Sequence, residues 1–390
     1  MRPPERNLHH REPGAPARPR GGSNEIFRLP VRGYFSSDGG ASWGGVDLPL
    51  PPAKGNGVNF GSDPTLAFDS SGNVYYGCIV VYVGNGNGIN GTAMAIARST
   101  DGGRTYPQFT VFSLECGENH LNDKPMITAD SNPASPFRDS VYAAWDAAVG
   151  GSSGGGVRFA RSTDGGKTFT ITRVDDPREQ GRAIGAIPFV GSNGEVYVAW
   201  NDFAANTIAF NRSFDGGATW GTPSVIASKR LPFDIAIPAE FNRGALVYPA
   251  CDTDRSAGAH RGRLYCSWMD LAASGNTDIY ASSSDDNGGT WSAARTVTDQ
   301  LPGVDRFNHW MSVDPVTGDA NVSFCDTRHD TTGARVMTDI YFTQNAGLVS
   351  FGGVSHPFWS DSRNQLDPFA GCRNGLAMEE VFTATVTNKR

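Results

Sequence analysis

Short runs of β-branched and aromatic residues, many with polar residues at alternate positions, recur along the whole chain. Runs of this kind predict strands. Each repeated unit starts with a strand that ends in Asp, as in residues 65–69 and 126–130. A second strand such as residues 196–200 follows a turn, and a third such as residues 157–161 comes next. The pattern therefore predicts an all-β chain made of repeated groups of strands.

At five places the chain carries one sequence pattern, Ser-x-Asp-x-Gly-x-x-aromatic. We call these segments the aspartate turns, and they span residues 36–43, 99–106, 162–169, 213–220 and 284–291. The Asp can accept hydrogen bonds from nearby backbone amides and so close a tight loop, while the Gly allows positive φ. The terminal aromatic residue packs as an anchor, so we expect a structural role for these turns.

Successive aspartate turns start 51 to 71 residues apart. An interval of that length holds about four short strands with the turns between them. Four-stranded sheets repeated around an axis form a β-propeller. Five blades can be counted, at residues 58–112, 118–175, 181–228, 240–298 and 303–348. A sixth is expected to combine strands from both chain ends, since ring closure removes exposed sheet edges; a seven-bladed ring is the alternative.

The aspartate turn resembles the Asp-box of bacterial neuraminidase repeats, which occurs in sialidases and in many sialidase-like secreted propellers. The resemblance covers roughly residues 27–385. It implies that residues 26–390 form a single sialidase-like β-propeller domain. Residues 1–25 are rich in Pro and Arg and hold no apolar segment, so we expect a disordered leader there and find no secretory signal.

Composition narrows the classes of partner. The net charge is −7 and no basic stripe is interleaved with aromatic residues, which argues against nucleic-acid binding. No apolar run approaches about 18 residues, so no membrane span is expected. We expect a monomer that needs no metal and no cofactor.

Six cysteines occur and none forms a CxxC pair, which argues against a zinc ribbon. Cys251 and Cys266 fall on successive predicted strands of one hairpin, so they can pair; buried free thiols are the alternative. Disulfides are typical of extracytoplasmic proteins. Relatives of the resembled kind are usually exported, so we expect an extracellular, periplasmic or cell-surface location.

The ends of the second strands provide one group of candidate site residues. Second strands that end in aromatic-x-Asp place Asp270, Asp326 and Asp361 at the top of the ring, where propellers usually bind ligands. Arg328 and Arg363 follow two of these Asp residues. All five are candidates for binding an anionic sugar. The alternative is that carboxylates on neighbouring strands clamp each Arg within its blade.

A second group lies where the inner strands start, near the axis, and differs from blade to blade as ligand-contacting residues would. It comprises Asp63, Asp123, Lys124, Arg306 and His309. Asp123 and His309 can act as acid–base catalysts if burial moves their pKa values. The other three would bind substrate. For each residue the alternative is a capped strand start that is hydrogen-bonded to a loop.

The resemblance also implies an activity. Sialidases hold the substrate carboxylate with three Arg residues and use a Tyr nucleophile coupled to a Glu, with an Asp as acid/base. Residues 27–30 (Phe-Arg-Leu-Pro) have a sequence close to the sialidase motif that contains the first of these Arg residues. However, only five residues separate them from the first aspartate turn. Tyr341 is a late Tyr, yet it aligns with aromatic residues that recur on third strands, which suggests packing.

The resemblance therefore implies an extracytoplasmic sialidase-like glycoside hydrolase that acts on glycans, acidic sugars among them, at a central top-face pocket. A propeller that binds glycan or protein without catalysis is the alternative, because fold alone does not establish function. A polysaccharide lyase is a further alternative, with His309 as the base and Arg306 as the charge-neutralising residue.

Overall fold

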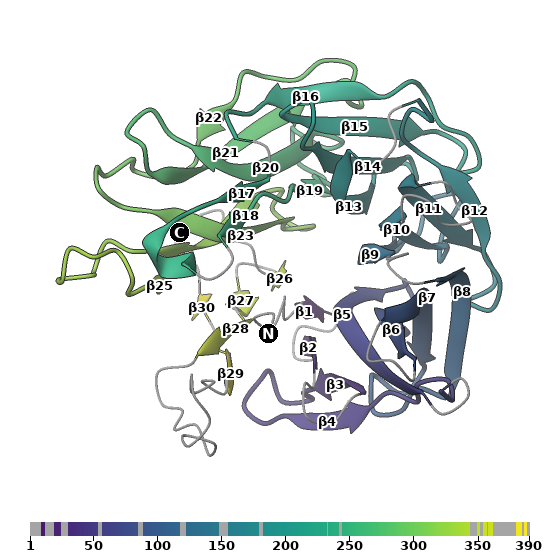
Figure 1. Ribbon diagram of the computed structural model, residues 1–390. Helices are drawn as coiled ribbons and strands as arrows, with labels where there is room; N and C mark the ends of the chain where they lie inside the picture. The colour runs from purple at the N-terminus through teal and green to yellow at the C-terminus, as the bar shows by residue number, and fades with distance from the viewer. Residues whose placement is uncertain are drawn as a thin grey trace, which may run out of the picture.

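The computed structural model shows strands arranged as blades around a ring (Figure 1). Apart from one 3-10 turn, every regular element of the described residues is a strand. The structure describes residues 9–11, 19–24, 30–53, 57–84, 89–117, 122–147, 155–178, 182–231, 233–241, 244–343, 349–351, 354–356, 358–361, 380–383 and 386–387 of the 390-residue chain. Six small antiparallel blades confirm the predicted all-β propeller.

The first five blades each contain four strands that pair in chain order. Blade 1 comprises β1 His9–Arg11, β2 Pro19–Asn24, β3 Val31–Phe35 and β4 Gly44–Asp47. Blade 2 comprises β5 Val58–Phe68, β6 Val74–Val83, β7 Ile89–Ser99 and β8 Gln108–Cys116. Blade 3 comprises β9 Asp123–Ala129, β10 Val141–Ala147, β11 Gly156–Ser162 and β12 Thr170–Arg173.

The second half of the ring is built in the same way. Blade 4 comprises β13 Ala183–Val190, β14 Val196–Asp202, β15 Thr207–Ser213 and β16 Ser224–Ser228. Blade 5 comprises β19 Ala250–Thr253, β20 Leu264–Leu271, β21 Thr277–Ser284 and β22 Arg295–Thr296. Blade 6 comprises β23 Arg306–Val313, β24 Ala320–Asp326 and β25 Asp339–Phe342.

The remaining short elements lie outside these sheets. Between blades 4 and 5 come β17 Asp234–Ile235, the 3-10 turn η1 Pro238–Glu240 and β18 Ala245–Leu246, and β17 pairs with β18. After blade 6 come β26 Val349–Phe351, β27 Val354–His356, β28 Phe358–Asp361, β29 Glu380–Thr383 and β30 Val386–Thr387.

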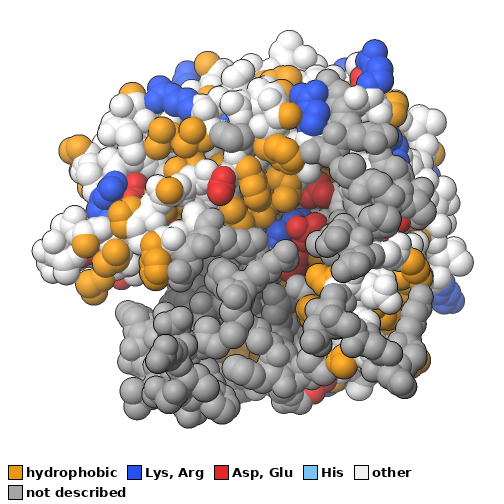
Figure 2. Space-filling model, viewed as in Figure 1, with side chains coloured by type: hydrophobic (Ala, Val, Ile, Leu, Met, Phe, Trp, Pro, Cys, Tyr) orange, Lys and Arg blue, Asp and Glu red, His pale blue; other side chains and the backbone are white. Residues whose placement is uncertain are grey.

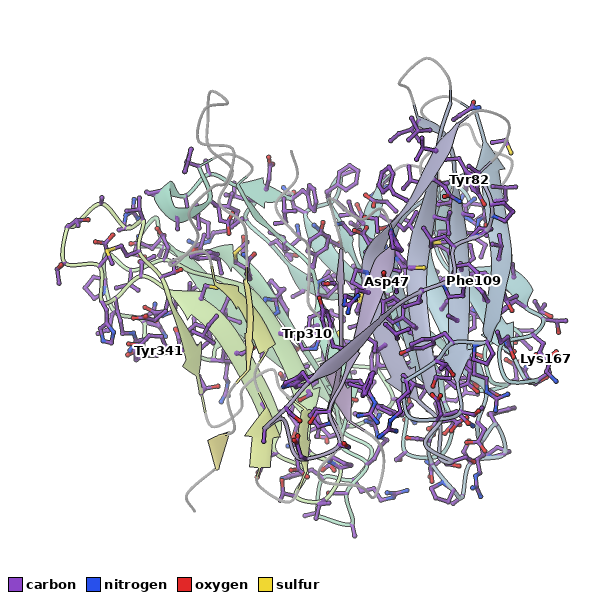
Figure 3. All side chains as sticks on the ribbon, turned by 90° about the horizontal axis from the view of Figure 1, so that it is seen from below. Asp47, Tyr82, Phe109, Lys167, Trp310 and Tyr341 are labelled. Atoms are coloured by element: carbon purple, nitrogen blue, oxygen red, sulfur yellow. A yellow bond between two sulfur atoms is a disulfide. The ribbon has the colours of Figure 1, made fainter. Side chains whose placement is uncertain are left out.

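The antiparallel order gives the ring two different faces. Inner strands start and second strands end at the same face, which we call the top face, whereas the aspartate turns follow the third strands and lie at the bottom face. In Figure 3, Tyr82 at the end of β6 and Lys167 in an aspartate turn lie toward opposite faces. Burial follows the same plan: β10 and β14 are buried at every position, while β12 at the rim has no buried residue.

The N-terminal blade differs from the expected shared blade. Strands β2 and β3 pair over five residues, so all four strands of this sheet come from the N-terminal segment. Strand β2 also lies within residues 1–25, where we expected a disordered leader. Its sequence, Pro-Arg-Gly-Gly-Ser-Asn, has no hydrophobic alternation, so it carries no strand signal. Packing places it instead, since a Cβ at Gly22 would lie 2.8 Å from the Tyr76 hydroxyl of blade 2.

The five aspartate turns share one hydrogen-bond pattern. In the turn after β11, the Asp164 carboxylate accepts hydrogen bonds from the Thr168 amide at 3.0 Å and from the Ser162 hydroxyl at 2.8 Å. The Gly166 amide in turn donates to the Ser162 hydroxyl at 2.8 Å. The two glycines of this turn have φ of 72° and 80°. As predicted, the Asp closes the loop and the glycines supply its left-handed backbone.

Three aspartate turns also accept a hydrogen bond from the blade before them. Arg161 Nη1 on β11 donates to the Asp215 carbonyl at 3.2 Å. Arg212 on β15 reaches the Asn287 carbonyl at 2.9 Å. In blade 2 the side chain of Gln108 takes this role, with its amide nitrogen 3.0 Å from the Gly165 carbonyl. These inter-blade contacts fasten neighbouring blades together at the bottom face.

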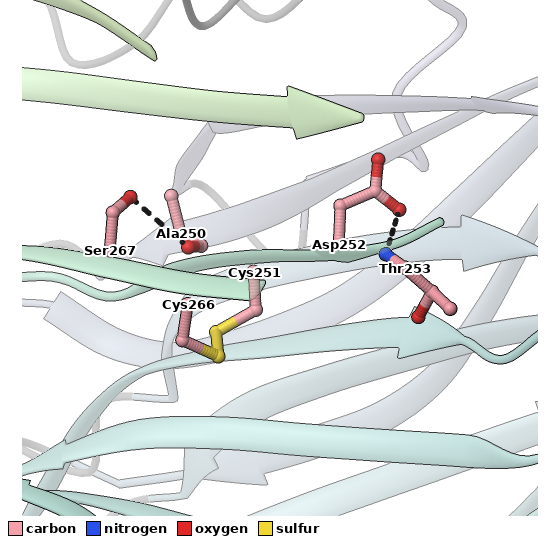
Figure 4. The surroundings of a disulfide bond; sticks show 6 residues. All are labelled: Ala250, Cys251, Asp252, Thr253, Cys266 and Ser267. Atoms are coloured by element: carbon pink, nitrogen blue, oxygen red, sulfur yellow. Dashed lines mark hydrogen bonds between the residues drawn. A yellow bond between two sulfur atoms is a disulfide. The ribbon is translucent and has the colours of Figure 1, made fainter. Parts of the chain in front are cut away.

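A disulfide joins Cys251 on β19 to Cys266 on β20 (Figure 4). The two residues are direct partners in the strand register, so the predicted hairpin pairing is confirmed. Cys78, Cys116 and Cys325 are free thiols, and Cys372 lies outside the described residues. In the part of the chain that the structure describes, we find no helix with the length and apolarity needed to cross a membrane.

Candidate active site

Four inner strands carry the same backbone irregularity near their top ends. Asp63 on β5, Lys124 on β9, Gly185 on β13 and Asn308 on β23 have φ between 49° and 71°. Each of these strands shifts register against its neighbour at this point. Such bulges bend a strand and redirect its side chains, and they are common next to active sites. A left-handed backbone at a non-glycine residue is uncommon and costs free energy.

Charged side chains from neighbouring blades meet at these bulges. The Lys124 ammonium nitrogen lies 3.7 Å from a carboxylate oxygen of Asp63, and the two side chains are only 4% and 8% exposed. The same nitrogen lies 5.8 Å from the centre of the Tyr248 ring. Blades 2 and 3 are thus linked to the segment that leads into blade 5.

Blade 4 joins this group of residues through Gly185 on β13. The buried Asp146 at the end of β10 accepts a hydrogen bond from the Gly185 amide at 2.7 Å. Tyr248 packs so closely on Gly185 that a Cβ there would lie 2.2 Å from its ring. Asp123 is half-buried, and its carboxylate accepts a hydrogen bond from the Lys124 amide at 3.0 Å. We call Asp63, Asp123, Lys124, Asp146 and Tyr248 the axial cluster.

A further carboxyl group reaches this face from the segment between blades 4 and 5. Glu240, in η1, accepts a hydrogen bond from the Asn308 side-chain amide at 3.0 Å. Burial raises the pKa of the Glu240 carboxyl, although the hydrogen bond from Asn308 opposes that shift. His309, half-buried, follows Asn308 on β23. The sequence analysis did not identify Glu240. The only indication was that the interval between the aspartate turns that start at residues 213 and 284 is the longest, which leaves room for an additional segment.

Arg306 lies away from the axial cluster in an ion-pair network between blades 5 and 6. Its side chain is 1% exposed and its guanidinium contacts carboxylates of Asp299 at 2.7 Å, Asp326 at 3.1 Å and Asp278 at 3.8 Å. Asp278 is the second residue of β21, and Asp326 ends β24. Carboxylates from both sides of the boundary between blades 5 and 6 thus hold Arg306, whereas the clamp that we considered as an alternative concerned Arg328 and Arg363 within their own blades.

Arg328 shares two of these carboxylates. Its guanidinium contacts Asp326 at 2.6 Å and Asp299 at 2.8 Å, and it lies over the Tyr341 ring at 4.1 Å from the ring centre. The hydrogen bond with Asp326 is the main cause that raises the pKa of Arg328, so the group stays charged. The Tyr341 hydroxyl lies 2.9 Å from a ring nitrogen of His329. Figure 3 places Tyr341 at the outer side of its blade, away from Trp310 on the inner strand.

The other candidate residues have separate environments. Asp270 accepts hydrogen bonds from the amides of Arg230 and Leu271, both at 2.8 Å, and so holds the loop after blade 4. Asp361 ends β28 opposite Glu380, and its side chain is outside the described part of the chain. Arg363 and the motif at residues 27–29 also lie outside the described residues.

Figure 2 views the top face and shows acidic and basic side chains close together near its middle, with a group of hydrophobic side chains beside them. Of the predicted residues, the structure brings Asp63, Asp123 and Lys124 together, whereas Arg306 and Arg328 pair with other carboxylates. Within the described residues, no group of three or more His, Cys, Asp or Glu side chains is arranged to hold a metal ion.

Comparison with known proteins tests the fold. No protein-family model matches the chain, and no curated protein matches it. Among solved structures, it is similar to a leech intramolecular trans-sialidase complexed with 2,7-anhydro-Neu5Ac, with 11% identity, 84% of this chain and 66% of that one covered, and a TM-score of 0.52.

Two bacterial structures give the same result. The intramolecular trans-sialidase from Ruminococcus gnavus, in complex with oseltamivir carboxylate, is 11% identical over 83% of this chain and 90% of that one, with a TM-score of 0.53. The NanB sialidase from Streptococcus pneumoniae is 11% identical over 85% and 66%, with a TM-score of 0.52. The chain thus spans about two thirds of the leech and NanB proteins. The ring of six blades and these likenesses together show that the chain has the sialidase-like β-propeller fold.

Proposed function

We propose that this protein is an extracytoplasmic, sialidase-like glycoside hydrolase that acts on acidic glycans at the axial cluster. The observation that carries the proposal is the convergence of Asp63, Asp123 and Lys124 at the top ends of the inner strands β5 and β9, with Asp146 beside them at the end of the second strand β10. Asp63 and Lys124 have a left-handed backbone. Titratable groups that share one buried site, next to redirected strand ends, are a recognised mark of a functional site.

Each charged group of the axial cluster has a chemical role in this proposal. Lys124 supplies a positive charge for the anionic group of the sugar, in competition with its present partner Asp63. A half-buried carboxyl such as Asp123 can exchange a proton with a substrate oxygen. His309 remains a further candidate for proton transfer.

Glu240 is the candidate general acid. Glycoside hydrolysis commonly needs one carboxyl group that is protonated when substrate binds and a second that is ionised. Burial raises the pKa of Glu240, which favours its protonated form, and the contact with Asn308 holds it at the top end of an inner strand. Glu240 would protonate the leaving oxygen while a carboxylate of the axial cluster stays ionised.

The disulfide supports the proposed location. Cys251 and Cys266 are joined in the structure, and disulfides persist mainly in extracytoplasmic compartments. The sialidase-like fold agrees with this location, because the proteins in which we recognised the aspartate turn are usually exported.

Glycan binding without catalysis is the second candidate, and one observation favours it. Arg306 and Arg328 are both paired with Asp299 and Asp326, so neither offers an uncompensated positive charge to a sugar carboxylate. Neither residue is therefore available for a three-arginine grip of the sialidase kind. The same pairing weakens the lyase alternative, which relied on Arg306.

A substrate screen with product analysis separates the candidates. We expect turnover of a sialoside, a uronic-acid polysaccharide or an aryl glycoside, with kcat reduced by about 100-fold or more in Asp123→Asn or Glu240→Gln, because general acid–base catalysis contributes at least that much. Lys124→Met should raise KM for acidic substrates. Asp319→Asn, an exposed carboxylate at the bottom face, is the control. Tight glycan binding with no product would support the second candidate instead.

A further inference from the structure

We infer that the top face of blade 4 carries an aromatic subsite for the sugar residues that adjoin the acidic one in an oligosaccharide. The subsite consists of Phe203, Phe233 and Tyr248, which we call the aromatic strip. This inference rests on the proposed function, because it takes the axial cluster as the place of the acidic sugar. It adds that the ligand is a chain of at least two or three sugars and gives the direction in which the chain runs.

The three rings are in mutual contact. The centres of the Phe203 and Phe233 rings are 6.5 Å apart, and those of Phe233 and Tyr248 are 5.6 Å apart. All three residues are half-buried, and the Tyr248 hydroxyl is buried. Phe203 follows β14, Phe233 precedes β17 and Tyr248 lies just before β19. Phe233 and Tyr248 thus flank the paired strands β17 and β18, and Phe203 from the end of blade 4 lies beside Phe233.

The aromatic strip begins at the axial cluster. Tyr248 belongs to both, since its ring centre lies 5.8 Å from the Lys124 ammonium nitrogen. From Tyr248 the row continues through Phe233 to Phe203, which comes directly after the last residue of β14. Figure 2 shows hydrophobic side chains gathered beside the central charged group on this face. A ligand with its charge at Lys124 would therefore extend outward over blade 4.

The backbone holds these rings in place without a ligand. The Phe203 amide donates to the Arg182 carbonyl at 2.9 Å, and the Phe233 carbonyl accepts from the Val247 amide at 2.7 Å. Tyr248 is fixed by its close packing on Gly185. A site that is ordered before binding loses less conformational entropy when the ligand arrives. These backbone contacts limit the movement of the segments that carry the rings, which lowers the entropic cost of binding.

The chemistry of the strip fits a carbohydrate chain. A pyranose ring has a flat face of C–H groups and a rim of hydroxyls, so it stacks on an aromatic ring through dispersion and loss of water while its rim stays hydrated. The ring planes are inclined by 45° between Phe203 and Phe233 and by 75° between Phe233 and Tyr248, so each sugar would stack on one ring and the chain would turn from ring to ring. A row one ring wide that starts at a buried charge is too narrow for a stable protein interface, which buries about 800 Å² per partner.

The test is calorimetric titration with four defined probes. These are N-acetylneuraminic acid, 3′-sialyllactose, trigalacturonic acid and neutral maltotriose. We expect an acidic trisaccharide to bind the wild-type protein about tenfold or more tightly than the acidic monosaccharide. Phe203→Leu and Phe233→Leu keep an apolar side chain but remove the flat ring, so they should lower the trisaccharide affinity about fivefold to tenfold and leave the monosaccharide affinity unchanged.

Phe241→Leu is the matched control. Phe241 lies in the same segment as Phe233, its side chain is 80% exposed, and it is outside the strip. The control should bind every probe as the wild type does. Melting curves of all variants check that the fold is intact, and the leucine substitutions are chosen because a truncation to alanine would open a cavity.

The outcomes separate this inference from the proposed function. If the acidic monosaccharide binds, but the trisaccharides bind no better and the strip variants change nothing, the aromatic strip is overturned and the axial site stands. A second outcome is that maltotriose binds as tightly as the acidic trisaccharides and that the strip variants lower its affinity. In that case the strip is supported and the acidic substrate class fails. If no probe binds, both are overturned.

Discussion

At the scale of the residue, the aspartate turn explains why glycine recurs at its fifth position. Positive φ is one requirement, and close packing against the preceding blade is the other. A Cβ at Gly217 would lie 2.3 Å from the Phe159 ring, and one at Gly288 would lie 2.2 Å from the Phe210 ring. These distances are shorter than any van der Waals contact. Only glycine satisfies both the turn and the contact between blades.

The first prediction concerns the Asp of the turn. Asp164→Ala should lower the free energy of unfolding by about 1–3 kcal/mol, because the backbone amides of Lys167 and Thr168 lose their acceptor. Glycan affinity should stay unchanged, since the turn is at the bottom face. Chemical denaturation with parallel titrations measures both. Asp234→Ala, an exposed Asp of β17, is the control. A loss of affinity without loss of stability would contradict the structural role.

The second prediction concerns the stability of the fold at acidic pH. Hydrogen bonds from the Thr290 amide and from the Ser284 and Thr290 hydroxyls lower the pKa of Asp286 from 3.8 to about 2. A carboxyl group with a depressed pKa in the folded state stabilises the fold above its unfolded pKa, and that stability is lost as the pH falls through the folded pKa. Between pH 3.8 and about 2 the free energy of unfolding should therefore decrease.

Asp286→Asn provides the comparison for this pH dependence. Because Asn does not titrate, the variant should lose less stability than the wild type over the same pH range. Urea denaturation at stepwise pH values measures the two slopes. If the free energy of unfolding changes with pH in the same way in both proteins, the Asp286 carboxylate does not cause the loss of stability in acid. Asp101 in another aspartate turn also has its pKa lowered to about 2, so burial there is outweighed by the hydrogen bonds that the carboxylate accepts.

At the scale of the element, blades are joined by contacts that no single strand pattern reveals. Arg212 on β15 is half-buried, and its guanidinium donates to the carbonyl of Asn287 in the next aspartate turn. It also lies over the Phe214 ring at 5.7 Å from the ring centre. Arg161 makes the corresponding contact one blade earlier. The third strand of one blade therefore positions the turn of the next.

The third prediction tests this contact. Arg212→Ala should destabilise the fold by about 1–2 kcal/mol, because the loss of a charge-assisted hydrogen bond leaves the Asn287 carbonyl without that donor. Arg295→Ala in β22, an exposed Arg of the next blade, should cost less than about 0.5 kcal/mol. Equal effects of the two substitutions in chemical denaturation would argue against an inter-blade role for Arg212.

The fourth prediction concerns the ion pairs of blades 5 and 6. Arg306→Met would leave the buried carboxylate of Asp278 without this cation and Asp326 with Arg328 alone, so we expect the free energy of unfolding to fall by about 3 kcal/mol or more. Arg328→Met should cost less, because Arg328 and its partner Asp299 are more exposed. Thermal and chemical denaturation give the values. Unchanged stability with weaker binding of acidic sugars would instead assign Arg306 to substrate.

At the scale of the whole molecule, the order of the sheets determines how the ring is completed. Blade 1 is built from β1 to β4 alone, and Gly22 on β2 lies against blade 2, where a Cβ would meet Tyr76 of β6 and Pro64 of β5. Arg20 on β2 is 1% exposed and donates hydrogen bonds to backbone carbonyls of Pro19 and Ser36. The N-terminal strands are therefore part of the propeller.

The fifth prediction follows from this order. Removal of residues 1–25 would delete β1 and β2 and expose the edge of β3, so we expect the melting temperature to fall by more than about 5 °C. Removal of residues 1–7, which leaves all strands in place, is the control. Differential scanning calorimetry measures both. A melting temperature unchanged by the longer deletion would show that blade 1 contributes little to the ring.

Much of the fold and part of the site could be predicted from the sequence. The strands of blades 2 to 5 follow from β-branched and aromatic runs, and the cysteine pair follows from adjacent strands of one hairpin. Asp63 and Lys124 were found because they interrupt the repeat at inner-strand starts. β2 and Glu240 were not found, because one has no hydrophobic pattern and the other lies in an irregular segment between blades.

The sequence by itself determined the aspartate turns, since every hydrogen bond that closes them joins residues at most four positions apart, as in Ser162 and Gly166. It also determined the strands, and with them the propeller. Only the tertiary structure decided which charges meet. Lys124 and Asp63 are 61 positions apart, and Arg306 could equally have faced substrate or Asp326. A charged residue has the same local pattern in either role, so its function depends on the partners that the ring brings to it.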